Sequence, residues 1–362
     1  DGNIFTSLLK TLHFFSQDVK HPRDGELLEA AQILRDGGLV AFPTETVYGL
    51  GANALNEEAA KKIYAAKGRP SDNPLIAHIS GERELAPLVA EIPETAKKLM
   101  KAYWPGPLTI IFRKSDKVPY GTTGGLDTVA VRMPSDPIAN RMIALAGVPV
   151  AAPSANTSGR PSPTAADHVW EDLSGKIEMI LDGGPVGIGL ESTIVDVTGE
   201  VPMLLRPGAI TLEMLRELLG QVDVDPAVTG PMSPGMHPKA PGMKYRHYAP
   251  KADMTLVEGG TEAMAAEICR LAQESISQGK KTGVICTEET RHLYPESLLG
   301  QAQFRSMGVR AKEETIAHNL YAVLREFDDI GVDCIFCEAF PETELGQAIM
   351  NRLIKAAGHK IV

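Results

Sequence analysis

The stretch Leu39-Val40-Ala41-Phe42-Pro43-Thr44-Glu45-Thr46-Val47-Tyr48-Gly49-Leu50-Gly51 places a short apolar run directly before a polar turn. The four apolar residues from Leu39 to Phe42 predict a buried strand. The two threonines and the glutamate come where that strand ends, and α/β sheets bind ligands at strand ends. A polar turn closed by its glycines is the other interpretation, and this stretch alone does not decide between them.

The chain up to about residue 220 repeats this alternation of apolar runs and helical periodicity. Strands are predicted at 39–42, 75–79, 108–112, 129–132, 148–152, 179–181 and 192–195. Helices are predicted at 25–35, 57–67, 136–146 and 211–219, where apolar residues recur every three or four positions. Strands this dense with helices between them predict an α/β sheet covered by helices.

The composition changes between residues 222 and 252. This segment holds six prolines, and no acidic residue occurs between Asp225 and Asp253. Such a composition is typical of a partly extended linker. From Met254 onward, strands (254–258, 282–286, 334–337) and helices (262–277, 313–327, 346–357) alternate again and predict a small open parallel sheet. We therefore expect domains at 20–221 and 253–362, joined by a linker at 222–252.

Charge and cysteine content limit the classes of function. The net charge of −10 over 362 residues argues against a protein that mainly coats nucleic acid, and no apolar run is long enough for a membrane span. Only four cysteines are present, which suits a reducing cytoplasm. Cys334 and Cys337 form a C-x-x-C, but residues three apart on a strand point to opposite faces. We therefore expect no metal site there.

Several polar residues stand beside the predicted strands and are candidates for a site. The segment Lys67-Gly68-Arg69-Pro70-Ser71-Asp72-Asn73-Pro74 follows a helix and carries two cations suited to phosphate. A solvated helix end is the alternative. His78, inside an apolar run, is by itself more typical of a core histidine. Arg132, at the end of another strand, suits a substrate carboxylate or a surface salt bridge.

Further candidates follow later strands. The segment from Ala151 to Ser162 is rich in small and hydroxyl residues, which let a ligand approach backbone amides. Glu191-Ser192-Thr193 opens one strand, and Arg206 closes another. The chain has no G-x-x-x-x-G-K-[ST] motif, so it is not a P-loop NTPase. An ATP site would have to be assembled from scattered strand ends.

Taken together and in this order, these segments resemble a known family. P-T-E-T-V-Y-G-L-G, K-G-R-P-S-D-N-P-L, T-V-A-V-R-M-P, A-A-P-S-A-N, E-S-T-I and L-L-R-P-G resemble the YrdC-like domain of threonylcarbamoyl-AMP synthases. P-G-M-K-Y-R-H-Y-A-P, at 241–250, resembles the connector of the two-domain form. The resemblance implies a YrdC-like twisted mixed sheet with flanking helices, followed by a small Rossmann-like open-sheet C-terminal domain.

The resemblance also implies a reaction, in which L-threonine, bicarbonate and ATP give threonylcarbamoyl-adenylate, pyrophosphate and water. Mg²⁺ is expected with the ATP. The product would pass to tRNA-modifying proteins that act on the adenosine beside the anticodon. Stable direct binding of nucleic acid and attachment to a membrane are not expected, and a cytoplasmic location is.

Site residues are carried over position by position. The implied threonine site comprises Thr46, His78, Arg132, Ala152 and Ser192. The implied ATP site comprises Arg69, Asn73, Thr128, Ser154, Ser162, Arg206 and Tyr245, with Lys67 beside the phosphates. Lys67 and Arg69 are the implied catalytic pair, acting by charge and position without a covalent enzyme intermediate. Tyr245, between Lys244 and Arg246, suggests that the linker covers the nucleotide as a lid.

Three other interpretations stay open. The first is a non-catalytic RNA-binding module, against which the acidic charge weighs. The second is carbamoyl transfer in hydrogenase maturation, whose proteins add zinc-finger and acylphosphatase-like segments that this sequence does not show. The third concerns the C-terminal domain alone, as a ligand sensor or a docking unit for a partner.

Overall fold

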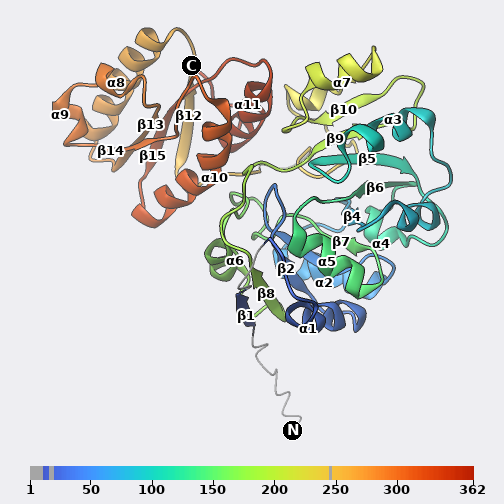
Figure 1. Cartoon of the computed structure of the whole chain (residues 1–362). Helices are drawn as coiled ribbons and strands as arrows, with labels where there is room; N and C mark the ends of the chain where they lie inside the picture. The colour runs from blue at the N-terminus through green and yellow to red at the C-terminus, as the bar shows by residue number, and fades with distance from the viewer. Residues whose placement is uncertain (1–10, 16–19, 244–246) are drawn as a thin grey trace. The chain divides into compact units, whose positions relative to one another are not determined.

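The computed structural model describes residues 11–15, 20–243 and 247–362 (Figure 1). The chain forms two compact units. The first comprises residues up to 158 together with 163–186 and 238–241; the second comprises 159–162, 187–237 and the chain from 242 onward. No helix among the described residues is long and apolar enough to cross a membrane.

The first unit is built on a mixed sheet with the strand order β1-β8-β2-β3-β7-β4-β6-β5. The pairs β1/β8, β2/β8 and β4/β6 are parallel, and β2/β3, β3/β7, β4/β7 and β5/β6 are antiparallel. The strands are β1 (Leu12–Phe15), β2 (Val40–Phe42), β3 (Gly49–Asn53), β4 (Ile76–His78), β5 (Leu108–Arg113), β6 (Thr128–Arg132), β7 (Val150–Ala151) and β8 (Met179–Asp182).

Six α-helices flank this sheet in the described part of the first unit. They are α1 (Asp24–Arg35), α2 (Glu57–Lys67), α3 (Glu94–Tyr103), α4 (Tyr120–Thr123), α5 (Pro137–Ala146) and α6 (Ala166–Leu173). Helix α2 begins after Asn56, whose side chain accepts a hydrogen bond from Ala59 N, and ends at the left-handed Gly68. Because these two signals fix the ends of the helix locally, the predicted bounds of 57–67 are confirmed.

The core of the first unit lies between α1, α5 and the sheet. Leu27 and Leu34 of α1 pack with Ile138 and Met142 of α5 against Phe42, and all five side chains are buried. These apolar residues are seven positions apart in α1 and four positions apart in α5, which places each pair on one face of its helix. Burial of such a face, more than helix propensity, holds each helix on the sheet.

The turn after β2 is shorter than the sequence indicated. It ends at Tyr48, because Gly49 already begins β3, which pairs antiparallel with β2. A Cβ atom on Gly51 would come within 2.8 Å of both Phe42 Cε1 and Val150 Cγ1. The glycines therefore serve close packing between strands, which periodicity does not reveal, and our interpretation of them as turn closers is corrected.

The second unit contains two groups of strands. In the first, β9 (Thr193–Asp196) pairs antiparallel with β10 (Met203–Arg206), and β10 pairs parallel with β11 (Asp223–Val224). Helix α7 (Leu212–Leu219) connects β10 to β11. The predicted linker thus begins with a short strand, followed by a 3-10 turn at Pro226–Val228.

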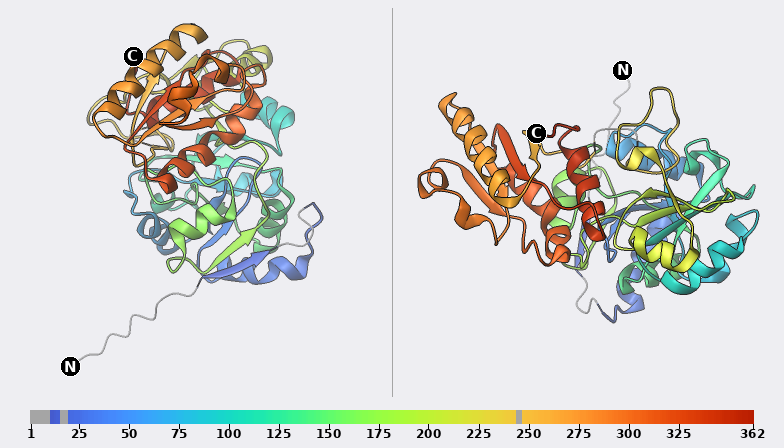
Figure 2. Two further views of the ribbon diagram at one scale, coloured as in Figure 1. Left: turned by 90° about the vertical axis from the view of Figure 1, so that its left-hand side faces the viewer. Right: turned by 90° about the horizontal axis from the view of Figure 1, so that it is seen from above.

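The last third of the chain forms the parallel sheet that the sequence predicted, in the order β12-β15-β13-β14. Its elements are β12 (Asp253–Val257), α8 (Thr261–Ser277), β13 (Thr282–Cys286), α9 (Glu296–Leu299), β14 (Gln303–Ser306), α10 (Glu313–Ile330), β15 (Cys334–Glu338) and α11 (Leu345–Ala356). Helix α8 covers one face, and α10 with α11 covers the other (Figure 2). This is the arrangement expected when right-handed crossovers run first one way and then back along a sheet.

Candidate functional site

His78 and Arg132 come together at the ends of two neighbouring parallel strands. They are register partners, and each is the last residue of its strand, β4 or β6. Both side chains are buried, at 4% and 3% exposure. A buried arginine needs hydrogen-bond acceptors around it, so its partners define the site.

Arg132 is held by the turn between β2 and β3. Its Nη1 donates to Thr46 Oγ1 at 3.0 Å, its Nη2 donates to Glu45 Oε1, and its Nε donates to Gly106 O at 3.2 Å. The hydroxyl of Thr44 shapes the turn by donating to Val47 O at 2.6 Å. A guanidinium has more N–H groups than these three contacts use, so donors remain for a substrate carboxylate.

Glu45 neutralises Arg132 and also accepts from Ser135, through the backbone N–H at 2.8 Å and through Oγ at 2.5 Å. Burial opposes ionisation of Glu45, but the Arg132 charge and the Ser135 hydrogen bonds outweigh it and lower the pKa. Burial and, less strongly, the Glu45 charge raise the pKa of Asp136 to about 6. Ser135 and Asp136 were not among the site residues predicted from the sequence, although both directly follow the T-V-A-V-R-M-P motif.

His78 is a neutral imidazole. Its Nδ1 lies 3.0 Å from Ile76 O and 3.2 Å from Val150 O, and both atoms are acceptors. The proton therefore belongs on Nδ1, which leaves the lone pair of Nε2 as an acceptor. Burial, followed by the Arg132 charge, lowers the pKa of His78 to about 3.

Ala152 lies beside the same strand. Its backbone N–H donates to Ile76 O at 2.9 Å, and its methyl group is buried. Four of the five residues predicted for threonine, Thr46, His78, Arg132 and Ala152, therefore belong to the first unit around β4 and β6. The fifth, Ser192, belongs to the second unit.

A second group of predicted residues gathers where β4 begins. Lys67, at the end of α2, donates from Nζ to Ser154 O and, at 2.7 Å, to Asn156 O. Arg69 donates to Asn73 O at 3.3 Å and to Pro74 O at 2.9 Å. The Oδ1 atom of Asn73 is buried and has no hydrogen-bond partner in the described part of the chain. A ligand donor would satisfy it.

Thr128 belongs with this second group. It begins β6, so its Cα lies about 13 Å from that of Arg132 at the other end of the strand. The register pairs Ala130 with Ile76, and extending it two residues back places Thr128 level with Pro74. The length of β6 thus separates Thr128 from Arg132, whereas Ser154 bridges to Gly49, directly beside the turn that carries Thr46.

The remaining predicted residues divide between the second unit and the undescribed positions. Ser162 donates to Glu191, and Arg206 donates from Nε to Ser192 O at 2.9 Å and from Nη2 to Ser192 Oγ at 3.2 Å. All four side chains are buried. Tyr245, with Lys244 and Arg246, lies outside the described residues, so the lid stays a prediction.

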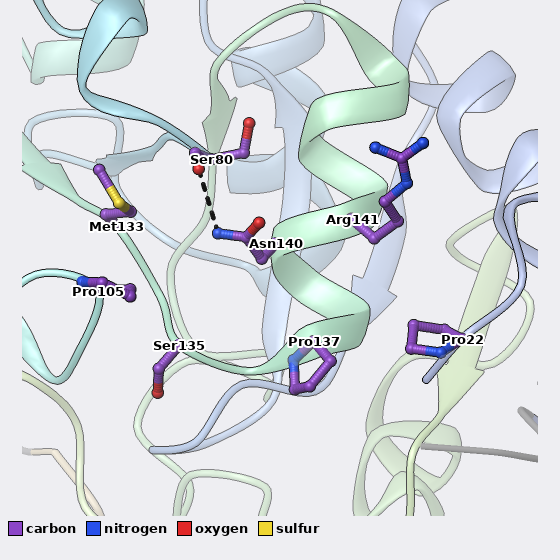
Figure 3. Close-up of a pocket in the computed structure, with 8 residues that line it drawn as sticks. All are labelled: Pro22, Ser80, Pro105, Met133, Ser135, Pro137, Asn140 and Arg141. Carbon is purple, nitrogen blue, oxygen red and sulfur yellow. Dashed lines mark hydrogen bonds between the residues drawn. The ribbon is translucent and has the colours of Figure 1, made fainter. Parts of the chain in front are cut away.

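A pocket of about 560 Å³ adjoins the Glu45–Arg132 pair through Ser135 (Figure 3). Besides Ser135 it is lined by Pro22, Ser80, Pro105, Met133, Pro137, Asn140 and Arg141. Asn140 Nδ2 donates to Ser80 O at 3.3 Å and braces one wall. None of the predicted site residues lines this pocket, and it is connected with them through Ser135, which donates to Glu45.

The fold and these polar groups define a two-domain α/β protein with buried cations at strand ends. Proteins of this class can bind anionic substrates, because the buried cations offset the substrate charge. A family model described as Telomere recombination (Sua5, YciO and YrdC) matches residues 32–208. A second, described as Threonylcarbamoyl-AMP synthase, C-terminal domain, matches residues 210–358.

Similar proteins cover nearly the whole chain. Threonylcarbamoyl-AMP synthase of Bacillus subtilis is 48% identical, covering 98% of this chain and 100% of the relative. The enzyme of Pyrococcus abyssi is 50% identical, covering 92% and 94%. A crystal structure of P. abyssi Sua5 complexed with L-threonine is 48% identical, covers 97% of this chain and 99% of that chain, and has a TM-score of 0.91. The chain therefore belongs to the two-domain threonylcarbamoyl-AMP synthase family, and the resemblance seen in its motifs is confirmed.

Proposed function

We propose that this chain makes threonylcarbamoyl-AMP, pyrophosphate and water from L-threonine, bicarbonate and ATP. The observation that carries the proposal is the buried group of Arg132, Thr46 and neutral His78, in a chain whose P. abyssi relative was solved with L-threonine. Arg132 offers guanidinium donors to the threonine carboxylate, and His78 Nε2 offers an acceptor to its amine or hydroxyl.

The threonine site in this proposal comprises Thr46, His78, Arg132, Ala152 and Ser192. The ATP site comprises Arg69, Asn73, Thr128, Ser154, Ser162, Arg206 and Tyr245, with Lys67 beside the phosphates. The unpartnered Oδ1 atom of Asn73 supports the second set, because the adenine amine and the ribose hydroxyls are donors that would satisfy it.

The chemistry divides into two steps. The threonine amine attacks the carbon of bicarbonate, water leaves, and a carbamate forms. A carbamate oxygen then attacks the α-phosphorus of ATP and pyrophosphate leaves. Lys67, Arg69 and Arg206 offset the charge on the triphosphate, so catalysis rests on position and electrostatics without a covalent enzyme intermediate.

Mg²⁺ would enter with ATP. Among the described residues no group of three or more His, Cys, Asp or Glu side chains is arranged to hold a metal ion. Mg²⁺ commonly keeps several waters and binds through substrate phosphates, so a protein cage is not required. We assign no step of the reaction to it.

The product would serve tRNA-modifying proteins, since an adenylate is an activated acyl donor. We place the enzyme in the cytoplasm, because all four cysteines are free thiols and three of them are buried.

The test is pyrophosphate release from ATP, measured with threonine and bicarbonate together and with each omitted. Release should require both co-substrates, and the adenylate should appear in equal amount by mass spectrometry. Release that is independent of threonine or bicarbonate would refute the proposal. Isolation of a radiolabelled adenylyl-enzyme would refute the absence of a covalent intermediate.

A further inference from the structure

Glu191 is a buried carboxylate at the centre of a polar cluster in the second unit, here called the Glu191 cluster: Ser162, Glu191, Ser192, Arg206, Tyr321 and Arg352. Glu191 accepts from Ser162 Oγ, from Tyr321 OH at 2.7 Å and from Arg352 Nε at 3.1 Å. Burial opposes its ionisation, but the charges of Arg352 and Arg206 outweigh this and lower the pKa. The carboxylate is therefore ionised and fully hydrogen-bonded.

Helix α11 holds two backbone segments near this carboxylate, 191–192 and 206–207, through its residue Arg352. Arg352 is fully buried, and besides Glu191 Oε2 it reaches Glu191 O from Nη2 at 3.1 Å and Pro207 O from Nη1 at 2.5 Å. Ser192 directly follows Glu191, and Arg206 directly precedes Pro207. Arg206 donates two hydrogen bonds to Ser192. One arginine from the C-terminal domain thus fixes the backbone on both sides of the Ser192–Arg206 pair.

Helix α10 holds the segment that carries Ser162. Arg325 donates from Nε and Nη2 to Pro161 O at 3.2 and 2.8 Å, and Asp328 pairs with Arg160 at 3.2 Å. With Tyr321 these residues recur every three or four positions, so one face of α10 carries them all. A Cβ atom on Gly189 would come within 2.6 Å of Ala317 O, so residues 187–191 also lie directly on this helix.

The cluster and its surroundings carry more positive than negative charge. Three cations, Arg206, Arg352 and the neighbouring Lys355, are offset by two carboxylates: Glu191 acts on the two arginines, and Asp225 acts on Lys355. Burial, followed by the Arg352 and Arg206 charges, lowers the pKa of Lys355 to about 8. Buried cations in excess fit a polyanionic ligand such as a triphosphate, whose charge would offset theirs.

We propose that Tyr321 and Arg352 are positioning residues for the reaction. They hold Glu191, and through it Ser162, Ser192 and Arg206, in the arrangement that binds ATP. The C-terminal domain therefore supports the nucleotide-binding residues that belong to the second unit, and it is not a separate sensor or docking unit. The inference rests on the proposed function, which assigns Ser162 and Arg206 to ATP.

The test compares two buried tyrosines of the C-terminal domain. Tyr321→Phe removes the hydroxyl that donates to Glu191, whereas Tyr294→Phe removes a hydroxyl that has no partner within the described ranges. Loss of a hydrogen bond to a charged group should raise the KM for ATP about 10-fold in Tyr321→Phe. Tyr294→Phe should keep wild-type values, and the KM for bicarbonate should not change in either variant.

Equal ATP parameters in the two variants and the wild type would overturn the inference. If Tyr321→Phe does not give folded protein, Glu191→Gln, which keeps the shape of the side chain, carries the same test.

Direct calorimetric titration with ATP distinguishes failure of the positioning role from failure of the proposed function. Weakened ATP binding in Tyr321→Phe, with no threonylcarbamoyl-AMP made by the wild type, refutes the proposed function alone. Normal product formation with unchanged ATP binding in Tyr321→Phe and Glu191→Gln refutes the positioning role alone.

Discussion

Arg132 is the residue on which the proposed threonine site depends, because its planar fork donates to Glu45 and Thr46 in the β2–β3 turn and also to Gly106 O. A lysine keeps the charge but cannot span them. Arg132→Lys should therefore lower kcat/KM for threonine by about 10- to 100-fold, the equivalent of one or two charge-assisted hydrogen bonds. Initial rates of pyrophosphate release against threonine concentration measure this.

Arg113→Lys is the matched control, because Arg113 belongs to the neighbouring strand β5 and its side chain is 63% exposed. It should leave kcat/KM unchanged. A normal KM for threonine in folded Arg132→Lys would remove Arg132 from the threonine site.

His78 makes the stability of the fold depend on pH. The unfolded chain binds a proton on this imidazole near pH 6.5, whereas the folded chain does so only at about 3. Its contribution is complete above pH 6.5 and decreases as the pH falls toward 3, by up to about 1.4 kcal/mol per pH unit. Urea unfolding at pH 7 and pH 5 should give a smaller pH-dependent loss for His78→Asn than for the wild type.

The exposed His292 gives the control for this measurement. His292→Asn should lose as much stability between pH 7 and pH 5 as the wild type does. Equal losses in the wild type and His78→Asn would mean that the buried imidazole is not the group that titrates.

At the scale of elements, the β2–β3 hairpin positions Thr46 and Glu45, and it packs closely only because Gly51 has no side chain. Gly51→Ala would force its methyl group against Phe42, Val150 and Val40 O. We expect a loss of about 2 kcal/mol in the free energy of unfolding, typical of overpacking. Urea denaturation measures the loss.

The control for the hairpin is Gly25→Ala in α1, where a new Cβ atom meets nothing within 4 Å. It should leave the free energy of unfolding unchanged or raise it by about 0.5 kcal/mol, because alanine favours helices over glycine. If Gly51→Ala is as stable as Gly25→Ala, close packing does not explain the glycine at position 51.

At the scale of the whole molecule, a net charge of −10 opposes binding of bare tRNA. In filter binding at about 0.15 M salt we expect no saturable complex below about 10 μM protein. Lowering the salt should produce only weak binding without sequence preference. A submicromolar complex that persists at 0.15 M salt would favour the RNA-binding interpretation.

Local signals in the sequence determined much of the fold. Helix α2 was predicted at its observed bounds because the Asn56 cap and the left-handed Gly68 act within a few residues of each end. The parallel C-terminal sheet could be predicted because the alternation of strands and helices is visible in the local periodicity of the sequence. The motifs likewise determined the family, because their order is itself a property of the sequence.

Contacts between residues far apart in the sequence could be identified only from the tertiary structure. Glu45 and Arg132 are 87 positions apart, and Glu191 and Arg352 are 161 apart. Which carboxylate meets which arginine depends on strand register and helix packing, and neither is encoded in a local pattern. Strand β3 was missed for a similar reason, since its glycines are explained only by Phe42 and Val150 across the sheet. The sequence alone therefore specified the elements and the family, and tertiary packing decided which charges are paired and buried.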